Sequence, residues 1–134
     1  MKAFFLILIL LLGDQWTKYY TVTGFVDPFI LTDWARFIYV KNTGVAFSIP
    51  IPSWVVLLGT GGIVGWLIKT LYKEGFHWKY VLLFAGAVGN AIDRIWHGFV
   101  IDFISIGNFP VFNMADIYIS VGIGLFLLEE WTGK

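Results

Sequence analysis

The sequence predicts an all-α integral membrane protein with four transmembrane helices and a small β-structured segment outside the membrane. Hydrophobic residues make up 58% of the 134 residues and charged residues only 13%. That charged share is about half of what an ordinary soluble domain carries. Four apolar stretches also occur, each close to the roughly 20 residues that cross about 30 Å of hydrocarbon. The length suits one domain over residues 1–134.

The first helix is expected at about residues 3–22. It begins like a secretory signal, with Lys2 followed by an apolar core, but it lacks the small-x-small cleavage site of such a signal. We therefore interpret it as a retained helix. The other three helices are expected at about residues 53–72, 80–99 and 114–131.

The stretch of about 24–52, between the first two helices, is the only long segment expected outside the membrane. Residues 34–40 and 45–49 are rich in β-branched and aromatic side chains, and residues 42–44 between them are typical of a turn. This segment is therefore predicted to form a small β-structure on the outer membrane surface.

Basic residues indicate the orientation. Lys69, Lys73 and Lys79 surround the short connection between the second and third helices, with Lys2 and Lys134 on the same side. On the opposite side the basic residues are spread over a much longer length. Because short cytoplasmic loops are rich in Lys and Arg, both termini are expected in the cytoplasm.

The composition excludes several kinds of protein. Nine Lys and Arg residues balance nine Asp and Glu residues, which is not the pattern of a nucleic-acid-binding protein. Cysteine is absent, so disulfides, thiolate metal sites and a Cys nucleophile are excluded. The only two histidines, His77 and His97, argue against a protein-only zinc site. We expect no metal, no cofactor and no nucleic-acid partner.

Three expected helices contain a carboxylate at a similar depth. Counted from the cytoplasmic helix ends at 1.5 Å per residue, Asp14, Asp93 and Asp116 lie about 18, 21 and 20 Å into the membrane. Ionisable groups inside membrane helices are costly and usually functional. The shared depth predicts one site in the outer half of the bilayer.

Two of these carboxylates share a local motif. Asn90 precedes Asp93 by three residues, and Asn113 precedes Asp116 by three. This spacing puts each amide and carboxylate on the same helical face, where the amide can donate a hydrogen bond that holds the carboxylate. Each asparagine taken alone is equally an ordinary interhelical hydrogen bond.

Asp102 is a fourth candidate. It lies nine residues beyond Asp93, where the third helix should end at the outer surface, and 14 residues before Asp116. A hairpin between them can bring Asp102 and Asp116 face to face. Two close carboxylates share one proton, so one can activate water while the other protonates the substrate. The spacing does not choose the pair among Asp93, Asp102 and Asp116.

Some of these polar residues can also be interpreted as purely structural. Asp14 can form a stabilising i, i+4 contact with Lys18, and Arg94 can pair with a carboxylate or reach the lipid headgroups. Two classes of function remain: an aspartyl hydrolase of the membrane, and a proton-coupled carrier or channel subunit. A carrier usually shows internal repeats and broken helices, which this sequence lacks beyond the doubled motif. The β-prone segment around Asn42 suits a cradle for an extended peptide.

Five segments, in order, resemble the signature blocks of the bacterial lipoprotein signal peptidases (signal peptidase II): DQWTK (14–18), KNTGVAFS (41–48), GAVGNAIDR (86–94), GFVIDF (98–103) and FNMAD (112–116). The resemblance spans nearly the whole chain. It implies an aspartyl endopeptidase that removes the signal peptide from diacylglyceryl-modified prolipoproteins, N-terminal to the lipidated lipobox cysteine. It also implies a bacterial cell membrane location, a site near the outer face, contact with membrane lipids and a monomer.

The resemblance also assigns residues. The catalytic acids of the family fall on Asp102 and Asp116, which resolves the choice that the spacing leaves open. Asn42 and Gly44 match the outer-loop block that contacts substrate. The residues that match supporting positions of the family's site are Asp14, Lys18, Asn90, Asp93, Arg94 and Asn113.

Overall fold

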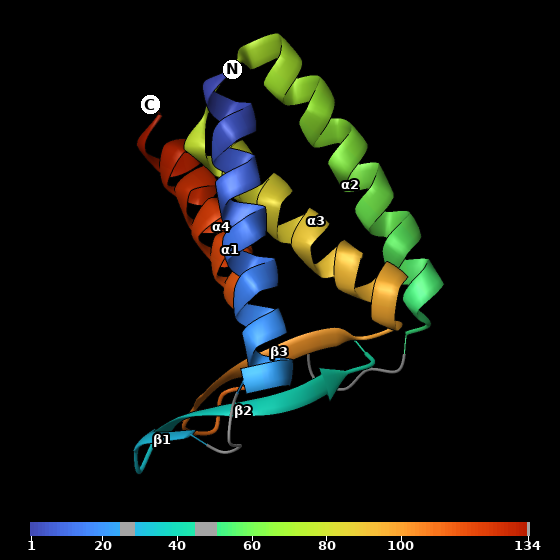
Figure 1. Ribbon diagram of the computed structural model, residues 1–134. Helices are drawn as coiled ribbons and strands as arrows, with labels where there is room; N and C mark the ends of the chain where they lie inside the picture. Colours follow the sequence, from blue (N-terminus) through green and yellow to red (C-terminus); the bar gives the residue numbers. More distant parts are fainter. Residues whose placement is uncertain (25–28, 45–50, 134) are drawn as a thin grey trace.

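The computed structural model describes residues 1–24, 29–44 and 51–133. Within these residues the chain forms four helices and one three-stranded sheet (Figure 1). In chain order the elements are α1 (Lys2–Gly24), β1 (Phe29–Thr32), β2 (Ala35–Asn42), α2 (Ser53–Glu74), α3 (Trp78–His97), β3 (Val100–Ile106) and α4 (Met114–Thr132). Helices occupy all four stretches that the sequence predicts as helical, with ends that differ by at most two residues.

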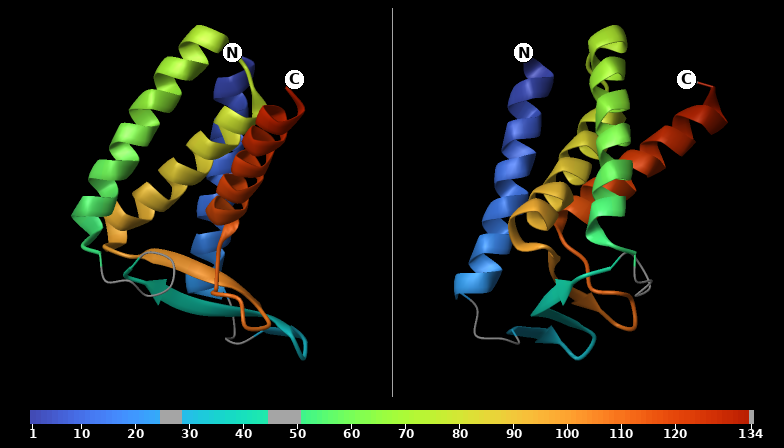
Figure 2. Two further views of the ribbon diagram at one scale, coloured as in Figure 1. Left: turned by 180° about the vertical axis from the view of Figure 1, so that it is seen from behind. Right: turned by 90° about the vertical axis from the view of Figure 1, so that its right-hand side faces the viewer.

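The helices stand on one side of the sheet. The three views agree that the sheet crosses one end of the helices and that both termini lie at the other end (Figures 1 and 2). α3 is the central helix, since it packs against α1, α2 and α4. The sheet end of the molecule is therefore where several elements that are distant in sequence meet.

Two glycines of α3 allow its neighbours to approach. A Cβ at Gly86 would lie 2.5 Å from the Ala115 carbonyl oxygen on α4, and one at Gly89 would lie 2.7 Å from Asp14 Oδ2 on α1. Small residues permit such close helix contacts in membranes. Gly61 and Gly65 of α2 have GxxxG spacing, yet a Cβ at either would meet no described atom within 4 Å.

The sheet differs from the expectation in its third strand. β2 is the central strand and pairs antiparallel with β1 and β3. β1 and β2 come from the predicted segment between the first two helices, but β3 comes from the connection between α3 and α4. The β-prone residues 45–49 lie outside the described residues.

The end of α3 explains how β3 begins. The third helix was expected to continue to residue 99, but it ends at His97, and Asp102 lies in a strand instead of at a helix end. Gly98 adopts a left-handed conformation (φ 79°) and its N–H donates to the Arg94 carbonyl oxygen, which closes the helix. The following residues, VIDFISI, are rich in the β-branched and aromatic side chains that favour strands.

One helix of the described residues is long and apolar enough to cross a membrane by itself. This is α2, whose mean hydropathy is 1.6, and only 11% of that apolar stretch is buried inside the protein. α1, α3 and α4 carry polar and charged side chains, which lower their hydropathy. Four membrane spans therefore stay a prediction.

Candidate active site

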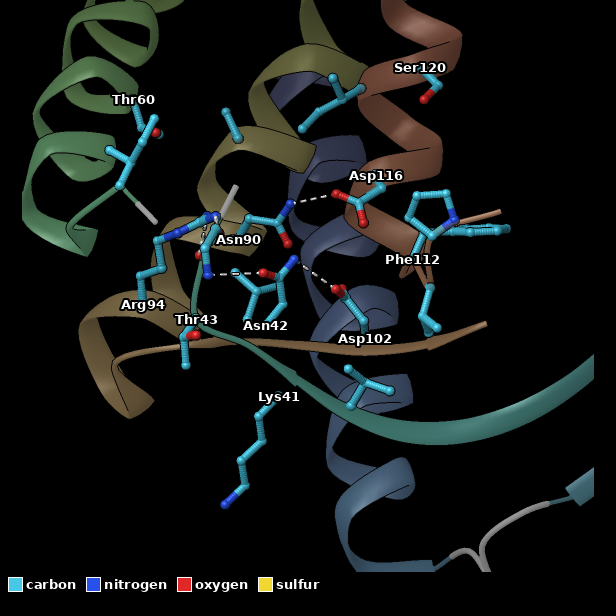
Figure 3. A pocket seen from close by; sticks show the side chains of 18 of the residues that line it. Lys41, Asn42, Thr43, Thr60, Asn90, Arg94, Asp102, Phe112, Asp116 and Ser120 are labelled. Atoms are coloured by element: carbon cyan, nitrogen blue, oxygen red, sulfur yellow. Dashed lines mark hydrogen bonds between the residues drawn. The ribbon is translucent and has the colours of Figure 1, made fainter. Parts of the chain in front are cut away.

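A pocket of about 1250 Å³ opens where the sheet meets α2, α3 and α4. Asp102 of β3 and Asp116 of α4 both line it, and their carboxylates point into the same space (Figure 3). Asn42, Asn90 and Arg94 line the opposite side (Figure 3). The structure thus brings together the two carboxylates that the family resemblance selects.

Asp116 is positioned by the start of α4. Asn113 is the N-cap: its side chain accepts a hydrogen bond from the Asp116 N–H (3.0 Å), and Asp116 Oδ2 accepts one from the Asn113 N–H (3.1 Å). This reciprocal arrangement is a capping box. Asp116 Oδ1 accepts a further hydrogen bond from Asn90 Nδ2 (2.9 Å).

Asp102 is positioned by the sheet. It lies opposite Val40 of β2, and it is 2% exposed. Asn42 Nδ2 donates to Asp102 Oδ2 (3.0 Å), and Asn113 Nδ2 donates to Asp102 Oδ1 (2.8 Å). Burial, followed by the negative charge of Asp116, raises the pKa of Asp102 to about 7, although the two amide hydrogen bonds act in the opposite direction.

In the repeated Asn-x-x-Asp motif, each side-chain amide therefore donates to a carboxylate on another element and not to the aspartate of its own motif. Asn90 donates to Asp116 of α4, and Asn113 donates to Asp102 of β3. Asn113 Nδ2 also lies 3.0 Å from Asn90 Oδ1, so the two amides are themselves linked. Both carboxylates of the pocket are held by one connected set of side-chain amides.

Asp14 and Asp93 form a separate cluster behind the pocket wall. Lys18 Nζ lies 2.8 Å from Asp14 Oδ2 and 2.9 Å from Asp93 Oδ2, with all three side chains buried. Gln15 Nε2 donates to Asp14 Oδ2 (3.1 Å) and Asp93 Oδ1 (3.0 Å). The expected contact between Asp14 and Lys18 is present, but the pocket lining, as far as the described residues define it, includes neither Asp14 nor Asp93.

The single site expected from three carboxylates at one depth thus consists of two adjoining groups. The depth estimate was insensitive to this division because it counts distance along the membrane normal and not direction around each helix. Gln15 was missed by the sequence analysis. It adjoins Asp14 in the DQWTK block, and that was the one signal that could have indicated it.

Arg94 joins the pocket rim to α3. Its guanidinium donates to the Gly44 carbonyl oxygen (3.4 Å) and to the Asn90 carbonyl oxygen (3.5 Å). Within the described part of the chain it has no carboxylate partner within ion-pair distance, although the charges of Asp116, Asp102 and Asp93 act on it. The Gly44 N–H donates to Asn42 Oδ1 (3.0 Å), which turns Asn42 Nδ2 toward Asp102. Asn42 and Gly44 belong to the KNTGVAFS block (41–48), of which residues 45–48 lie outside the described residues.

The pocket continues between α2 and α4 as an apolar channel. Ile63, Ile119 and Ile123 contribute to its walls, and the hydroxyls of Thr60 and Ser120 are its polar groups there. The sequence analysis did not identify these wall residues, because apolar positions that line a pocket look the same in sequence as positions that face lipid. No group of three His, Asp or Glu side chains suited to a metal ion occurs in residues 1–24, 29–44 and 51–133.

Comparisons with known proteins agree on one family. The family model described as signal peptidase (SPase) II matches residues 6–132. The lipoprotein signal peptidase of Dichelobacter nodosus is 38% identical in an alignment 145 positions long, which covers 96% of this chain and 94% of that protein. The lipoprotein signal peptidase of Thermodesulfovibrio yellowstonii is 38% identical in an alignment 139 positions long, which covers 92% of this chain and 90% of that protein.

Solved structures give the same picture. A bacterial membrane enzyme determined by the in meso method at 2.3 Å resolution superposes with a TM-score of 0.87, is 29% identical, and is matched over 98% of this chain and 88% of that chain. A second one, at 1.9 Å resolution, has a TM-score of 0.83 and 30% identity over 95% of this chain and 90% of that chain.

Proposed function

The chain belongs to the signal peptidase II family, membrane proteases that process lipoproteins, and from this membership we propose an aspartyl endopeptidase with a defined cleavage position. It cuts the signal peptide from diacylglyceryl-modified prolipoproteins on the N-terminal side of the lipidated cysteine. The observation that carries this proposal is the pair Asp102 and Asp116, which line one pocket and are held by the same amides. The family membership does not favour a proton-coupled carrier.

The two carboxylates divide the work by their surroundings. With its pKa raised to about 7 by burial and by the charge of Asp116, Asp102 keeps a proton up to near-neutral pH. Asp116 lies at the N-terminal end of α4 and is held by hydrogen bonds from Asn90 Nδ2 and the Asn113 N–H. Since Asp102 is the member that carries the proton, we assign Asp116 as the initial base and Asp102 as the initial acid.

The reaction then balances as follows. Asp116 takes a proton from water as the water oxygen bonds to the carbonyl carbon before the lipidated cysteine, and Asp102 gives its proton to the carbonyl oxygen. Asp116 next gives its proton to the cysteine nitrogen as the C–N bond breaks. The new carboxyl group returns one proton to Asp102, so both carboxylates regain their starting state.

The surrounding residues hold the substrate. Asn42 and Gly44, at the pocket rim, contact the extended peptide, while Arg94 fixes the backbone of Gly44. The apolar channel between α2 and α4 lets the signal helix and acyl chains remain in contact with membrane lipids. Anchoring the substrate beside Asp102 and Asp116 lowers the barrier through positioning. Asp14, Lys18, Asn90, Asp93 and Asn113 support the pair from behind.

The arrangement of the helices, the sheet and the termini also supports a proposed membrane topology. All four helices cross the bacterial cell membrane as one domain, with both termini in the cytoplasm and the pocket near the outer face. The position of both termini opposite the sheet supports this orientation (Figures 1 and 2). The enzyme is proposed to act as a monomer, because one chain supplies both carboxylates and the amides of Asn42, Asn90 and Asn113 that hold them.

The test is cleavage of a diacylglyceryl-modified prolipoprotein beside an unlipidated copy, in detergent or liposomes. Mass spectrometry is expected to find cleavage N-terminal to the cysteine with the lipidated substrate alone, unchanged by a chelator. Cleavage at another bond, or equal cleavage of both substrates, would contradict the proposal.

A further inference from the structure

We propose that Lys18, which lies behind the pocket wall, is a positioning residue for both Asp102 and Asp116. This inference rests on the proposed function, because it assigns a task within that site. Lys18 is 1% exposed, and its ammonium group lies where α1 meets α3. The mechanism assigns it no chemical step, although burying a lysine in this way is costly unless every proton is accepted.

Three oxygen atoms surround the ammonium group of Lys18. Nζ donates hydrogen bonds to Asp14 Oδ2 (2.8 Å) and Asn90 Oδ1 (3.3 Å) and forms an ion pair with Asp93 Oδ2 (2.9 Å). An ammonium group has donors and no acceptor, so each of these oxygens faces a group that can only donate. Each acceptor belongs to a side chain that makes a second contact next to the pocket.

Two of these side chains hold the backbone beside the catalytic pair. Asp14 Oδ1 accepts from the N–H of Ala115 (2.9 Å), the residue before Asp116. Asp93 Oδ2 accepts from the N–H of Ile101 (3.0 Å), the residue before Asp102. Lys18 therefore fixes two carboxylates that also hold the chain immediately before each member of the pair, Asp14 through its other oxygen and Asp93 through the same oxygen that faces Lys18.

The third side chain, Asn90, acts through the direction of its amide. Its Oδ1 accepts from Lys18 and from Asn113 Nδ2 (3.0 Å), so its Nδ2 is left facing Asp116 Oδ1 (2.9 Å). The reversed amide would set its NH₂ against two donors and its oxygen against a carboxylate. Because Lys18 can only donate, it determines the direction of this amide.

The test uses two variants with equal charge. Both carry Asp14→Asn, which removes the negative charge that balances Lys18; one adds Lys18→Gln and the other Lys18→Met. Glutamine keeps an N–H for Asn90 Oδ1, whereas methionine has none. The matched charge separates the direction of the Asn90 amide from the electrostatic effect of losing an ammonium group.

kcat and KM for cleavage of the lipidated substrate are then measured for both variants. The methionine variant is expected to have a kcat about tenfold or more below that of the glutamine variant, with KM within about threefold. Equal kcat in the two folded variants would overturn the proposal, since a lysine that only stabilises the fold would change the melting temperature and not kcat.

If the methionine variant does not fold, a second measurement on the wild-type protein tests the proposal. Side-chain amide NMR of ¹⁵N-asparagine-labelled wild-type protein should give slowly exchanging Asn90 protons in a single orientation. A rapidly exchanging or rotating Asn90 amide would refute the proposal. Wild-type protein that fails to cut the lipidated substrate would instead count against the proposed function, and the NMR result would still test the role of Lys18.

Discussion

The hydrogen bond from Asn42 to Asp102 yields a quantitative prediction. Asn42 Nδ2 lies 3.0 Å from Asp102 Oδ2, and this bond opposes the burial that raises the pKa of Asp102 to about 7. In the proposed mechanism Asp102 must start protonated. Activity is therefore present below pH 7 and falls as the pH rises through that pKa. Asn42→Ala removes a donor that favours the charged carboxylate, so the pKa should rise.

The size of the shift follows from the bond that is lost. A hydrogen bond to a charged group is worth about 1.5–3 kcal/mol, and Asn42 is partly exposed, so the lower end applies. Since about 1.4 kcal/mol corresponds to one pKa unit, the alkaline limb of kcat should move from about pH 7 to about pH 8.

The assay is kcat for a lipidated peptide across the neutral and alkaline range in detergent. Thr43→Ala is the control: this neighbouring side chain also lines the pocket, but it makes no hydrogen bond to Asp102 in the described part of the chain. Its limb should stay where the wild-type limb is. A limb that is unchanged in Asn42→Ala, or that moves to lower pH, would refute the assignment of Asp102 as the protonated acid.

Three further predictions concern stability. Gly86→Ala should lower the free energy of unfolding by about 1–3 kcal/mol, since the new Cβ would meet α4 at 2.5 Å, whereas Gly61→Ala should leave it equal or raise it; equal melting of the two variants would contradict the packing of α3 on α4. Asp14→Asn should lower it by about 1–3 kcal/mol, because the buried Lys18 loses one of its two ion partners and keeps only Asp93; an unchanged melting temperature would argue against a structural role. The folded chain binds the Asp102 proton more tightly than the unfolded chain does. The free energy of unfolding of the wild type should therefore fall, relative to that of Asp102→Asn, as the pH rises from about 4 to about 7. If the free energies of unfolding of the two proteins change in parallel with pH, the raised pKa is contradicted.

Much of the fold was predictable because apolar length specifies helices strongly. All four helical stretches follow from runs of about 20 apolar residues, and the Asn and Asp motifs lie where the structure has its buried polar residues. β3 was not predictable from the same signal, because its seven residues are as apolar as the preceding helix. Gly98 marks the boundary, but its left-handed conformation depends on how the chain turns toward β2.

The sequence predicted which carboxylates and amides belong to the site, but not how they are grouped in space. Four carboxylates were identified, but only three-dimensional packing separates Asp102 and Asp116 in the pocket from Asp14 and Asp93 around Lys18. The partners of the amides were equally hidden, since Asn90 reaches Asp116 across 26 residues and Asn113 reaches Asp102 across 11. Hydrogen bonds between elements leave no periodicity in a single sequence.

The most direct measurement of the central claim compares three substitutions of one kind. Asp102→Asn and Asp116→Asn each remove one member of the pair, and Asp33→Asn changes an exposed aspartate in the turn between β1 and β2. Cleavage of a diacylglyceryl-modified prolipoprotein should be lost in the first two variants and retained in the third, with all three melting as folded proteins. Wild-type turnover in a folded Asp102→Asn or Asp116→Asn variant would contradict the two-carboxylate mechanism.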